Sequence, residues 1–460
     1  MMSWKPNRSS SQSLYEQIKS WMITKINQGE WVIGEKLPTQ RKLAEQLEVN
    51  RSTIIQVLEE LKAEGILASK QGGYTYVKSK SWNQFIKNQP KLNWSRTINQ
   101  GLYKSNLDTI QKVNEYEFSP GIIRLGTGEM SPDLMPAKLI KNAIVNIQLD
   151  STNLGYSESQ GDLVLRESLS KHLLKRGLHT SPENILIVSG ALQALQLISL
   201  GLLDAKSYIF YDRPSYLPSI PSVHSLYCAQ LKDNQNKGFY YTIPTLNNPT
   251  GDILNIEERK EILSSTNMPI IEDDVYHELT FEHAPNALKS FDHDGQVIYI
   301  GSVSKVISPG LRIGWVVAPT LVINRLADLK MQLDYGCSTL SQQVISNLLN
   351  TAAYDDHVTH LRQQLKERAS FMENLLEKLF SPISTWNTPK GGYYIWIKFE
   401  KPVITKSLFQ NLLKKNILIN PGYLYYPKDY YHLRLSFAYC TFEEMEHGLS
   451  LLYEEVMKVI

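Results

Sequence analysis

Residues 297–315 read VIYIGSVSKVISPGLRIGW, and this stretch decides the fold class of most of the chain. It starts with an apolar run, 297–300, that is typical of a short strand buried on both faces. The run leads through Gly301 and Ser302 into a turn that carries Lys305. A lysine on such a turn can be partly desolvated, which makes its amine nucleophilic, as Schiff-base chemistry requires. The alternative is a solvent-facing loop lysine, and most lysines lie in such places.

Similar apolar runs occur on both sides of this stretch and are separated by helical patterns. The other predicted strands after Gly121 are 185–188, 208–211, 239–243, 269–271 and 315–318, with helices such as 191–203 and 257–264 between them. This alternation predicts an α/β domain with a mostly parallel sheet covered by helices. From about residue 345, a long helix, the strands 392–399 and 432–438, and two further helices predict a smaller α+β lobe.

Polar side chains follow two of the predicted strands. Asn248 comes shortly after the strand 239–243, and Asp273 and Tyr276 follow the strand 269–271. Ligands bind at the carboxyl ends of strands in open α/β sheets. Each cluster alone could be a plain turn. Together with Lys305 they supply what a pyridoxal ring needs, namely a buried carboxylate for the pyridine nitrogen and donors to the phenolic oxygen.

Four residues form a predicted phosphate site. Gly190 and Ala191 close a strand and open a helix, where free amides and the helix dipole attract an anion. Ser302 and Arg312 flank Lys305 as further phosphate donors. A Ser-Gly turn before a helix is common, so this signal depends on its neighbours.

Two more side chains are candidates for the same site. Tyr216 could stack on the cofactor, and Arg434 could bind a carboxylate bidentately. The alternatives are a tyrosine of the core and an arginine of a surface ion pair.

The amino-terminal segment 14–77 reads as three helices and a hairpin. Apolar residues recur at helical spacing in 14–26, 43–47 and 54–61, and a tight turn separates the second helix from the third. The third helix exposes Arg51, Ser52 and Thr53 near its start, where a recognition helix meets the major groove. Two short strands around Gly72 predict a wing.

Charge is distributed unevenly along the chain. Residues 1–118 hold 17 Lys and Arg against 11 Asp and Glu, whereas the rest holds 31 against 35. A basic amino-terminal part on an acidic body is compatible with a nucleic-acid-binding module. Residues 79–118 lack clear periodicity and contain Pro90 and many polar residues, so we expect a linker. Trp82, Phe85 and Trp94 are too apolar for a free tether, and we expect part of it to dock on the larger domain.

Bulk properties exclude several classes of protein. A chain of 460 residues with 42% hydrophobic and 20% charged residues is expected to be a soluble protein of two or more domains. The longest apolar stretch, 185–203, is interrupted by polar residues, which argues against a membrane span. The start lacks a secretory signal, which favours the cytoplasm. Three widely spaced cysteines, Cys228, Cys337 and Cys440, argue against disulfides and a zinc site, and we expect no metal.

The ordered set of residues around Lys305 resembles the fold-type I (class I and II) aminotransferases from about Gly121 to Ile460. The resemblance implies that Lys305 forms the internal aldimine with pyridoxal 5'-phosphate (PLP). It assigns the pyridine nitrogen to Asp273, the phenolic oxygen to Tyr276 and Asn248, the phosphate to Gly190, Ala191, Ser302 and Arg312, the stacked ring to Tyr216 and the substrate carboxylate to Arg434. It also implies a homodimer with a head-to-tail arrangement, in which Tyr156 reaches the phosphate of the neighbouring subunit's cofactor.

Residues 14–77 independently resemble the GntR-type winged helix, through 14–18, 37–41, 49–53 and 63–65. The resemblance implies that Thr39, Arg41, Arg51, Ser52, Thr53 and Gly72 contact a double-stranded DNA operator. A winged helix before an aminotransferase-like body is similar to the MocR subfamily of bacterial regulators. We therefore expect a winged helix-turn-helix domain at 10–78, a linker at 79–118 and a fold-type I PLP-binding domain at 119–460, with a small lobe from about 345.

Three functions follow from this resemblance. The leading hypothesis is a PLP-dependent transcription regulator that senses PLP or a small amino-acid-like effector. The second is a genuine aminotransferase acting on an amino acid and a 2-oxo acid, because every residue for that chemistry is present. The third is a constitutive repressor with a relict pocket.

Overall fold

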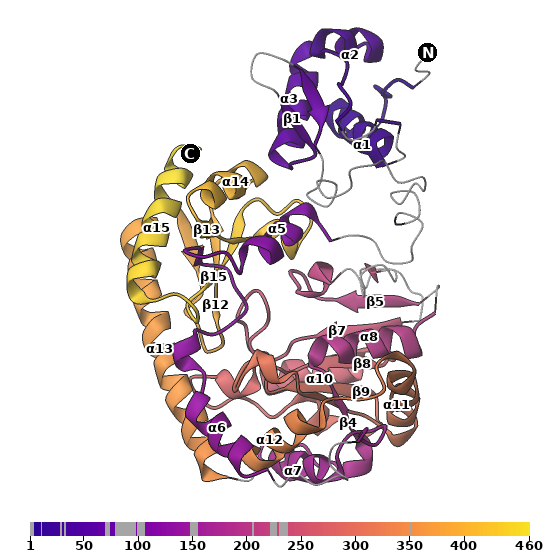
Figure 1. Ribbon diagram of the computed structural model, residues 1–460, viewed down its shortest axis with the longest axis vertical. Helices are drawn as coiled ribbons and strands as arrows, with labels where there is room; N and C mark the ends of the chain where they lie inside the picture. The colour runs from indigo at the N-terminus through magenta and orange to yellow at the C-terminus, as the bar shows by residue number, and fades with distance from the viewer. Residues whose placement is uncertain are drawn as a thin grey trace. The chain divides into compact units, whose positions relative to one another are not determined.

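The computed structural model describes residues 4–10, 12–27, 30–31, 34–69, 74–78, 98, 106–147, 155–204, 207–220, 228–229, 238–349 and 351–460 (Figure 1). They divide into two compact units. One holds the described residues up to Lys112 together with Lys406–Asn411, and the other holds the remaining residues from Val113 onward.

The amino-terminal part is a three-helix module with a two-stranded hairpin. Its elements are α1 (Leu14–Asn27), α2 (Gln40–Leu47), α3 (Arg51–Ala63), β1 (Leu67–Ser69) and β2 (Thr75–Val77). The apolar residues that recur at helical spacing, such as Ile18, Leu43 and Leu58, are buried together with the hairpin residues Leu67 and Val77. Because helices this short are marginal alone, this shared core is what holds them.

The second unit is built on a seven-stranded sheet with the order β4-β10-β9-β8-β7-β5-β6. The strands are β4 (Ile185–Val188), β5 (Tyr208–Tyr211), β6 (Cys228–Ala229), β7 (Gly238–Thr242), β8 (Ile270–Asp273), β9 (Val297–Ser302) and β10 (Gly314–Val317). Only β10 runs antiparallel to its neighbours, and the other pairs are parallel. The mostly parallel sheet expected from the sequence is confirmed.

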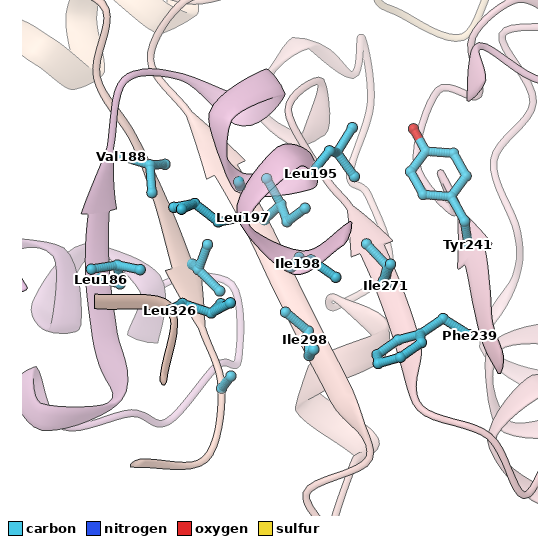
Figure 2. Close-up of a cluster of buried hydrophobic side chains, with 14 of the residues drawn as sticks. Leu186, Val188, Leu195, Leu197, Ile198, Phe239, Tyr241, Ile271, Ile298 and Leu326 are labelled. Atoms are coloured by element: carbon cyan, nitrogen blue, oxygen red, sulfur yellow. The ribbon is translucent and has the colours of Figure 1, made fainter. Parts of the chain in front are cut away.

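Alternate side chains of the strands enter two separate cores. Tyr241, Ile271 and Ile298 belong to one cluster with side chains of α8 (Ala191–Leu202) and α11 (Thr320–Leu333). Figure 2 shows the three residues together with Leu195 and Ile198 of α8. Their neighbours Tyr240 and Ile270 belong to a cluster on the other face, together with side chains of α10 (Ile256–Ser265). Because strand side chains alternate between faces, a sheet with helices on both sides needs apolar residues at every position.

The carboxyl-terminal part carries a smaller sheet with the order β11-β12-β15-β14. Its strands are β11 (Ser384–Trp386), β12 (Tyr394–Phe399), β14 (Asn420–Pro421) and β15 (His432–Ser436), and a separate parallel pair is β3 (Ile123–Arg124) with β13 (Ile417–Leu418). The remaining helices are α5 (Asp108–Tyr116), α6 (Ala137–Val145), α7 (Leu163–Leu174), α12 (Thr339–Leu349), α13 (Ala352–Phe380), α14 (Lys406–Lys414) and α15 (Phe442–Met457).

Among its described residues, the segment expected to be a linker contains the helix α5. The helix α5 lies inside 79–118, and 79–97 and 99–105, with Trp82, Phe85 and Trp94, fall outside the described residues. Within the described part of the chain, Cys337 and Cys440 are free and buried, and there is no cluster of His, Cys, Asp or Glu that could hold a metal. The helices of the described residues include none that is long and apolar enough to cross a membrane.

Candidate functional site

A cavity of about 360 Å³ lies where β7, β8 and β9 end. Its walls include nine residues that the sequence analysis singled out: Ala191, Tyr216, Asn248, Asp273, Tyr276, Ser302, Lys305, Arg312 and Arg434. These residues are far apart in sequence, and the parallel strands bring them to one edge of the sheet.

Lys305 lies in the turn after β9 and reaches into this cavity. Its Nζ donates to the carbonyl oxygen of Gly128 at 2.6 Å and lies 5.8 Å from the ring centre of Tyr276 and 5.9 Å from that of Tyr393. Tyr393 also donates a hydrogen bond to the backbone carbonyl of Lys305. The amine is therefore held at the cavity wall and is not a free surface cation.

Asp273, the last residue of β8, is a buried carboxylate with one oxygen to spare. The hydroxyl of Tyr241 donates to its Oδ2 at 2.8 Å, whereas its Oδ1 has no hydrogen-bond partner among the described residues. Burial raises the pKa of Asp273 to about 6. A buried acceptor of this kind is costly unless a donor or a positive charge meets it. A protonated pyridine nitrogen is such a group.

Two tyrosines and an arginine line the wall near Asn248. The hydroxyls of Tyr276 and Tyr394 are 3.0 Å apart, and burial holds the pKa of Tyr276 well above its usual value, so the phenol stays a hydrogen-bond donor. Arg434 donates to the side-chain oxygen of Asn248 at 2.8 Å and to the carbonyl of Gly126 at 2.6 Å. Because Asn248 uses its oxygen for this bond, its amide nitrogen is the end that can serve as a donor.

The guanidinium of Arg434 is buried and only partly paired. It lies 3.9 Å from the ring centre of Tyr394, and its Nε has no partner in the described part of the chain. A carboxylate is the natural partner for a buried guanidinium with a spare donor.

The part of the cavity wall formed by Ala191, Ser302 and Arg312, with Gly190 just before it, is suited to an anion. Gly190 begins α8 with a φ of 85°, and a Cβ at this position would lie 2.7 Å from Nη2 of Arg312. The first amides of α8, beginning with Ala191, lack partners within the helix. Arg312 donates to the carbonyl of Ser189 at 2.7 Å, and the hydroxyl of Ser302 lies 3.0 Å from the carbonyl oxygen of Ile313. Helix amides, a guanidinium and a nearby hydroxyl make a phosphate site.

These residues fit PLP by the chemistry of their side chains. The cavity offers an amine, a buried carboxylate with an unpaired oxygen, phenol and amide donors, and an anion site at a helix start. Tyr216 also lines the cavity, and burial raises its pKa to about 12, so its ring is neutral and available for stacking.

Tyr156 does not belong to this cavity. Its side chain is 83% exposed and its ring lies 5.0 Å from that of Tyr335. The role given to it by the family resemblance is toward a neighbouring subunit, for which an exposed position is required.

The predicted DNA-contacting residues lie at the starts of α2 and α3. Thr39 caps α2 by accepting a hydrogen bond from the amide of Lys42, and Arg41 is exposed beside Glu45. Arg51 and Ser52 are exposed at the start of α3, Thr53 is half-buried, and Arg51 lies 3.4 Å from Gln40. Gly72 falls outside the described residues. Asn50 occupies the N-cap position of α3 but makes no side-chain capping bond, contrary to the capping role its residue type favours.

Sequence reasoning missed the segment Gly126–Thr127–Gly128, of which Thr127 and Gly128 line the cavity, and the lining residues Glu117 and Tyr394. Gly126 and Gly128 supply the carbonyls that hold Arg434 and Lys305. A Cβ on Gly126 would lie 2.5 Å from the amide nitrogen of Asn420, so the close approach needs glycine. Two glycines around a threonine after a short strand were the available signal for this segment.

Two family models of known proteins match the two parts of the chain. The family model "Aminotransferase class I and II" matches residues 120–226 and 225–452, and "Bacterial regulatory proteins, gntR family" matches residues 14–77.

Similar proteins carry both parts. The HTH-type transcriptional regulator YisV of Bacillus subtilis is 42% identical over 99% of each chain. The HTH-type transcriptional regulator NorG of Staphylococcus aureus strain N315 is 38% identical over 92% of this chain and 100% of its own.

Solved structures resemble the larger part. Kynurenine aminotransferase of Pyrococcus horikoshii, solved in complex with PMP, has a TM-score of 0.71 at 27% identity and covers 78% of this chain and 96% of its own. LysN, the α-aminoadipate aminotransferase of Thermus thermophilus, has a TM-score of 0.71 at 26% identity over 80% and 100%.

Proposed function

The chain belongs to the MocR subfamily of GntR-type regulators, which join a winged helix to an aminotransferase-like domain, and on this premise we propose that it is a PLP-dependent transcription regulator. One observation carries the proposal. A buried carboxylate oxygen of Asp273, to which no described residue donates a hydrogen bond, belongs to the same cavity wall as the amine of Lys305. That pair is what the two reactive ends of a pyridoxal ring require.

The cavity residues bind different parts of the cofactor. Lys305 binds its aldehyde carbon, Asp273 its pyridine nitrogen, and Tyr276 with Asn248 its phenolic oxygen. Gly190, Ala191, Ser302 and Arg312 bind the phosphate, and Tyr216 stacks on the ring. PLP supplies an electrophilic carbon to which an amino compound can attach. Arg434 binds the carboxylate of that effector, because its buried Nε has no hydrogen-bond partner among the described residues.

The regulator acts as a homodimer that binds a double-stranded DNA operator. In a head-to-tail pair, Tyr156 reaches the phosphate site of the other subunit, in keeping with its exposure in the single chain. Thr39, Arg41, Arg51, Ser52, Thr53 and Gly72 contact the DNA. Effector binding changes the relative populations of dimer arrangements and so the presentation of the two winged helices.

The test is a footprint of the full-length protein on the DNA upstream of its neighbouring genes, with and without added PLP. We expect protection of two half-sites that changes in extent or affinity when PLP and amino acids are present. A footprint that is the same under all conditions contradicts the proposal, and favours a constitutive repressor if the purified protein also lacks a visible PLP absorbance band.

A second function is supported by the completeness of the site. Lys305 is also the group that would move a proton in transamination, and Asp273 and Arg434 are both in place. Steady-state turnover of an amino donor and a 2-oxo acid, abolished by Lys305→Ala, would establish an aminotransferase. A single half-reaction without turnover would leave the regulator as the better description.

A further inference from the structure

Glu117 is a charged residue of the cavity that the proposed function leaves without a task. It follows directly after α5 and lines the same cavity as Lys305 and Arg434. The hydroxyl of Thr127 donates a hydrogen bond to its Oε1. The side chain is half-buried, and no Lys, Arg or His within the described part of the chain forms an ion pair with it.

The other charges of the cavity wall are already assigned. Lys305, Arg312 and Arg434 are its cations, and the proposed function uses them for the aldehyde, the phosphate and the effector carboxylate. Asp273 is used for the pyridine nitrogen. Glu117 is the one remaining charge among the described lining residues, and it is negative.

A second carboxylate strengthens the negative field beside Glu117. Glu129 lies close enough that the charge of Glu117, after burial, raises the pKa of Glu129. Two cations offset part of this effect on the pKa of Glu129, namely Arg124, whose Nη1 lies 3.6 Å from Glu129, and Lys305. Two carboxylates near each other are stabilised when a cation comes close to both.

An aliphatic residue lies next to this acidic end. Val113, one helical turn before Glu117 on the chain, also lines the cavity. Residues four apart lie on the same side of a helix, so Val113 offers apolar contact to a methylene chain that leads toward Glu117.

We propose that Glu117 selects an effector with a second ammonium group, that is, an amino acid of the ornithine or lysine class. The effector carboxylate binds Arg434, its methylene chain contacts Val113, and its distal ammonium binds Glu117. The same carboxylate excludes amino acids with an acidic side chain by like-charge repulsion. This inference rests on the proposed function, because it takes Arg434 as the site of the effector carboxylate.

The test is isothermal titration calorimetry of the PLP-loaded full-length protein with matched amino acids. L-ornithine is compared with L-norvaline and L-lysine with L-norleucine, because each pair differs by the terminal amine, and L-glutamate tests the opposite charge. The variants are Glu117→Gln and, as a matched control, Glu115→Gln, an exposed glutamate two residues earlier that does not line the cavity.

We expect the diamino acids to bind the parent protein about tenfold more tightly than their neutral partners, the size of one charge-assisted hydrogen bond. Glu117→Gln should remove this difference and relieve the exclusion of L-glutamate, whereas Glu115→Gln should keep both. Equal binding of charged and neutral partners by the parent, or a preference that survives in Glu117→Gln, overturns the inference. A protein that takes up no PLP refutes the proposed function instead, and calorimetry with the cofactor-free chain still measures the charge preference.

Discussion

The two functional regions of this chain are built in opposite ways. The predicted DNA-contacting residues of α2 and α3 lie mostly on the surface, and the side chain of Arg41 is 84% exposed. The polar core of the cavity is buried, with Asn248 and Asp273 4% exposed and Arg434 3% exposed, whereas Lys305 is half-buried and Arg312 is exposed. An exposed side chain is ordered by the DNA it binds, whereas a buried one is held in place beforehand.

Because of this difference in burial, substitutions in the two regions should differ in how they affect the free energy of unfolding. A substitution on the surface of the winged helix should change DNA binding and leave the free energy of unfolding nearly unchanged. A substitution of a buried cavity residue should change both PLP binding and the free energy of unfolding, because each buried polar group is part of a hydrogen-bond network. The following predictions test this contrast.

The largest effect is expected for Lys305→Ala. Since Lys305 is the one lysine that lines the cavity among the described residues, its loss should abolish the visible absorbance band of lysine-bound PLP. The variant should still bind DNA, but without any response to PLP. Absorbance spectra and mobility-shift assays with and without PLP measure both, and Lys366→Ala, an exposed lysine of α13, is the control. A full-strength band in Lys305→Ala would show that the cofactor is bound elsewhere.

The second largest effect is expected from salt, which should weaken DNA binding much more than PLP binding. DNA affinity should fall by about a thousandfold between roughly 50 and 200 mM salt, because phosphate neutralisation releases counterions. PLP affinity should change by less than about tenfold over the same range, since partly buried charges are screened much less. Fluorescence anisotropy of labelled DNA and titration of the PLP band give the two slopes. Parallel slopes would contradict the contrast.

Asp273→Asn should lower the affinity for PLP and raise the stability of the cofactor-free protein. We expect PLP affinity to fall about a hundredfold, or ~3 kcal/mol, because a neutral amide cannot pair with a protonated pyridine nitrogen. The cofactor-free protein should become more stable at pH 8, because the raised pKa of about 6 means that the buried charge destabilises the folded state.

The pH dependence of the stability tests the direction of that effect. The folded-state pKa of Asp273 is raised from 3.8 to about 6, so the folded chain binds more protons than the unfolded chain between these values. The parent should lose stability from this group as the pH rises from about 4 to 6, and Asp273→Asn should not. Thermal unfolding of both cofactor-free proteins across this range measures it, and identical profiles would show that Asp273 carries no such burial penalty.

The strands of the large sheet could be predicted from the sequence because their signal is local. The segments 185–188 and 208–211 form strands with the predicted bounds. That Asn248, Asp273 and Lys305 line one cavity could be predicted because parallel strands end at one edge of the sheet.

The missed parts of the site depend on contacts between distant segments. Lys305 meets Gly128, which is 177 residues away, and Arg434 meets Gly126, which is 308 residues away. No local pattern encodes such a contact. Glu117 was missed for the same reason, because α5 falls in a segment whose polar composition predicts a linker.

The surface region should give smaller effects. Arg51→Ala should weaken specific DNA binding by about 1–3 kcal/mol, the value of a bidentate base contact, and leave the PLP spectrum and the melting temperature unchanged. Arg325→Ala, an exposed arginine of α11 paired with Asp328, removes the same charge far from the predicted DNA contacts in sequence and is the control. Equal DNA affinity of Arg51→Ala and the parent would show that Arg51 makes no specific contact with the DNA bases.

The smallest effects concern the two helix starts of the winged helix. Thr39 accepts a capping bond from Lys42, so Thr39→Ala should lower the local stability of α2 by about 1 kcal/mol. Asn50 makes no such bond, so Asn50→Ala should change α3 by only about 0.3 kcal/mol. Hydrogen exchange of the amides of each helix, followed by mass spectrometry, measures the two local opening free energies. If Thr39→Ala weakens DNA binding while the hydrogen-exchange protection of α2 is unchanged, Thr39 contacts DNA directly. If DNA affinity and the protection of α2 fall together, Thr39 supports DNA binding by capping the start of α2. In that case the exposed DNA-contacting residues also depend on a helix that is ordered before DNA binds.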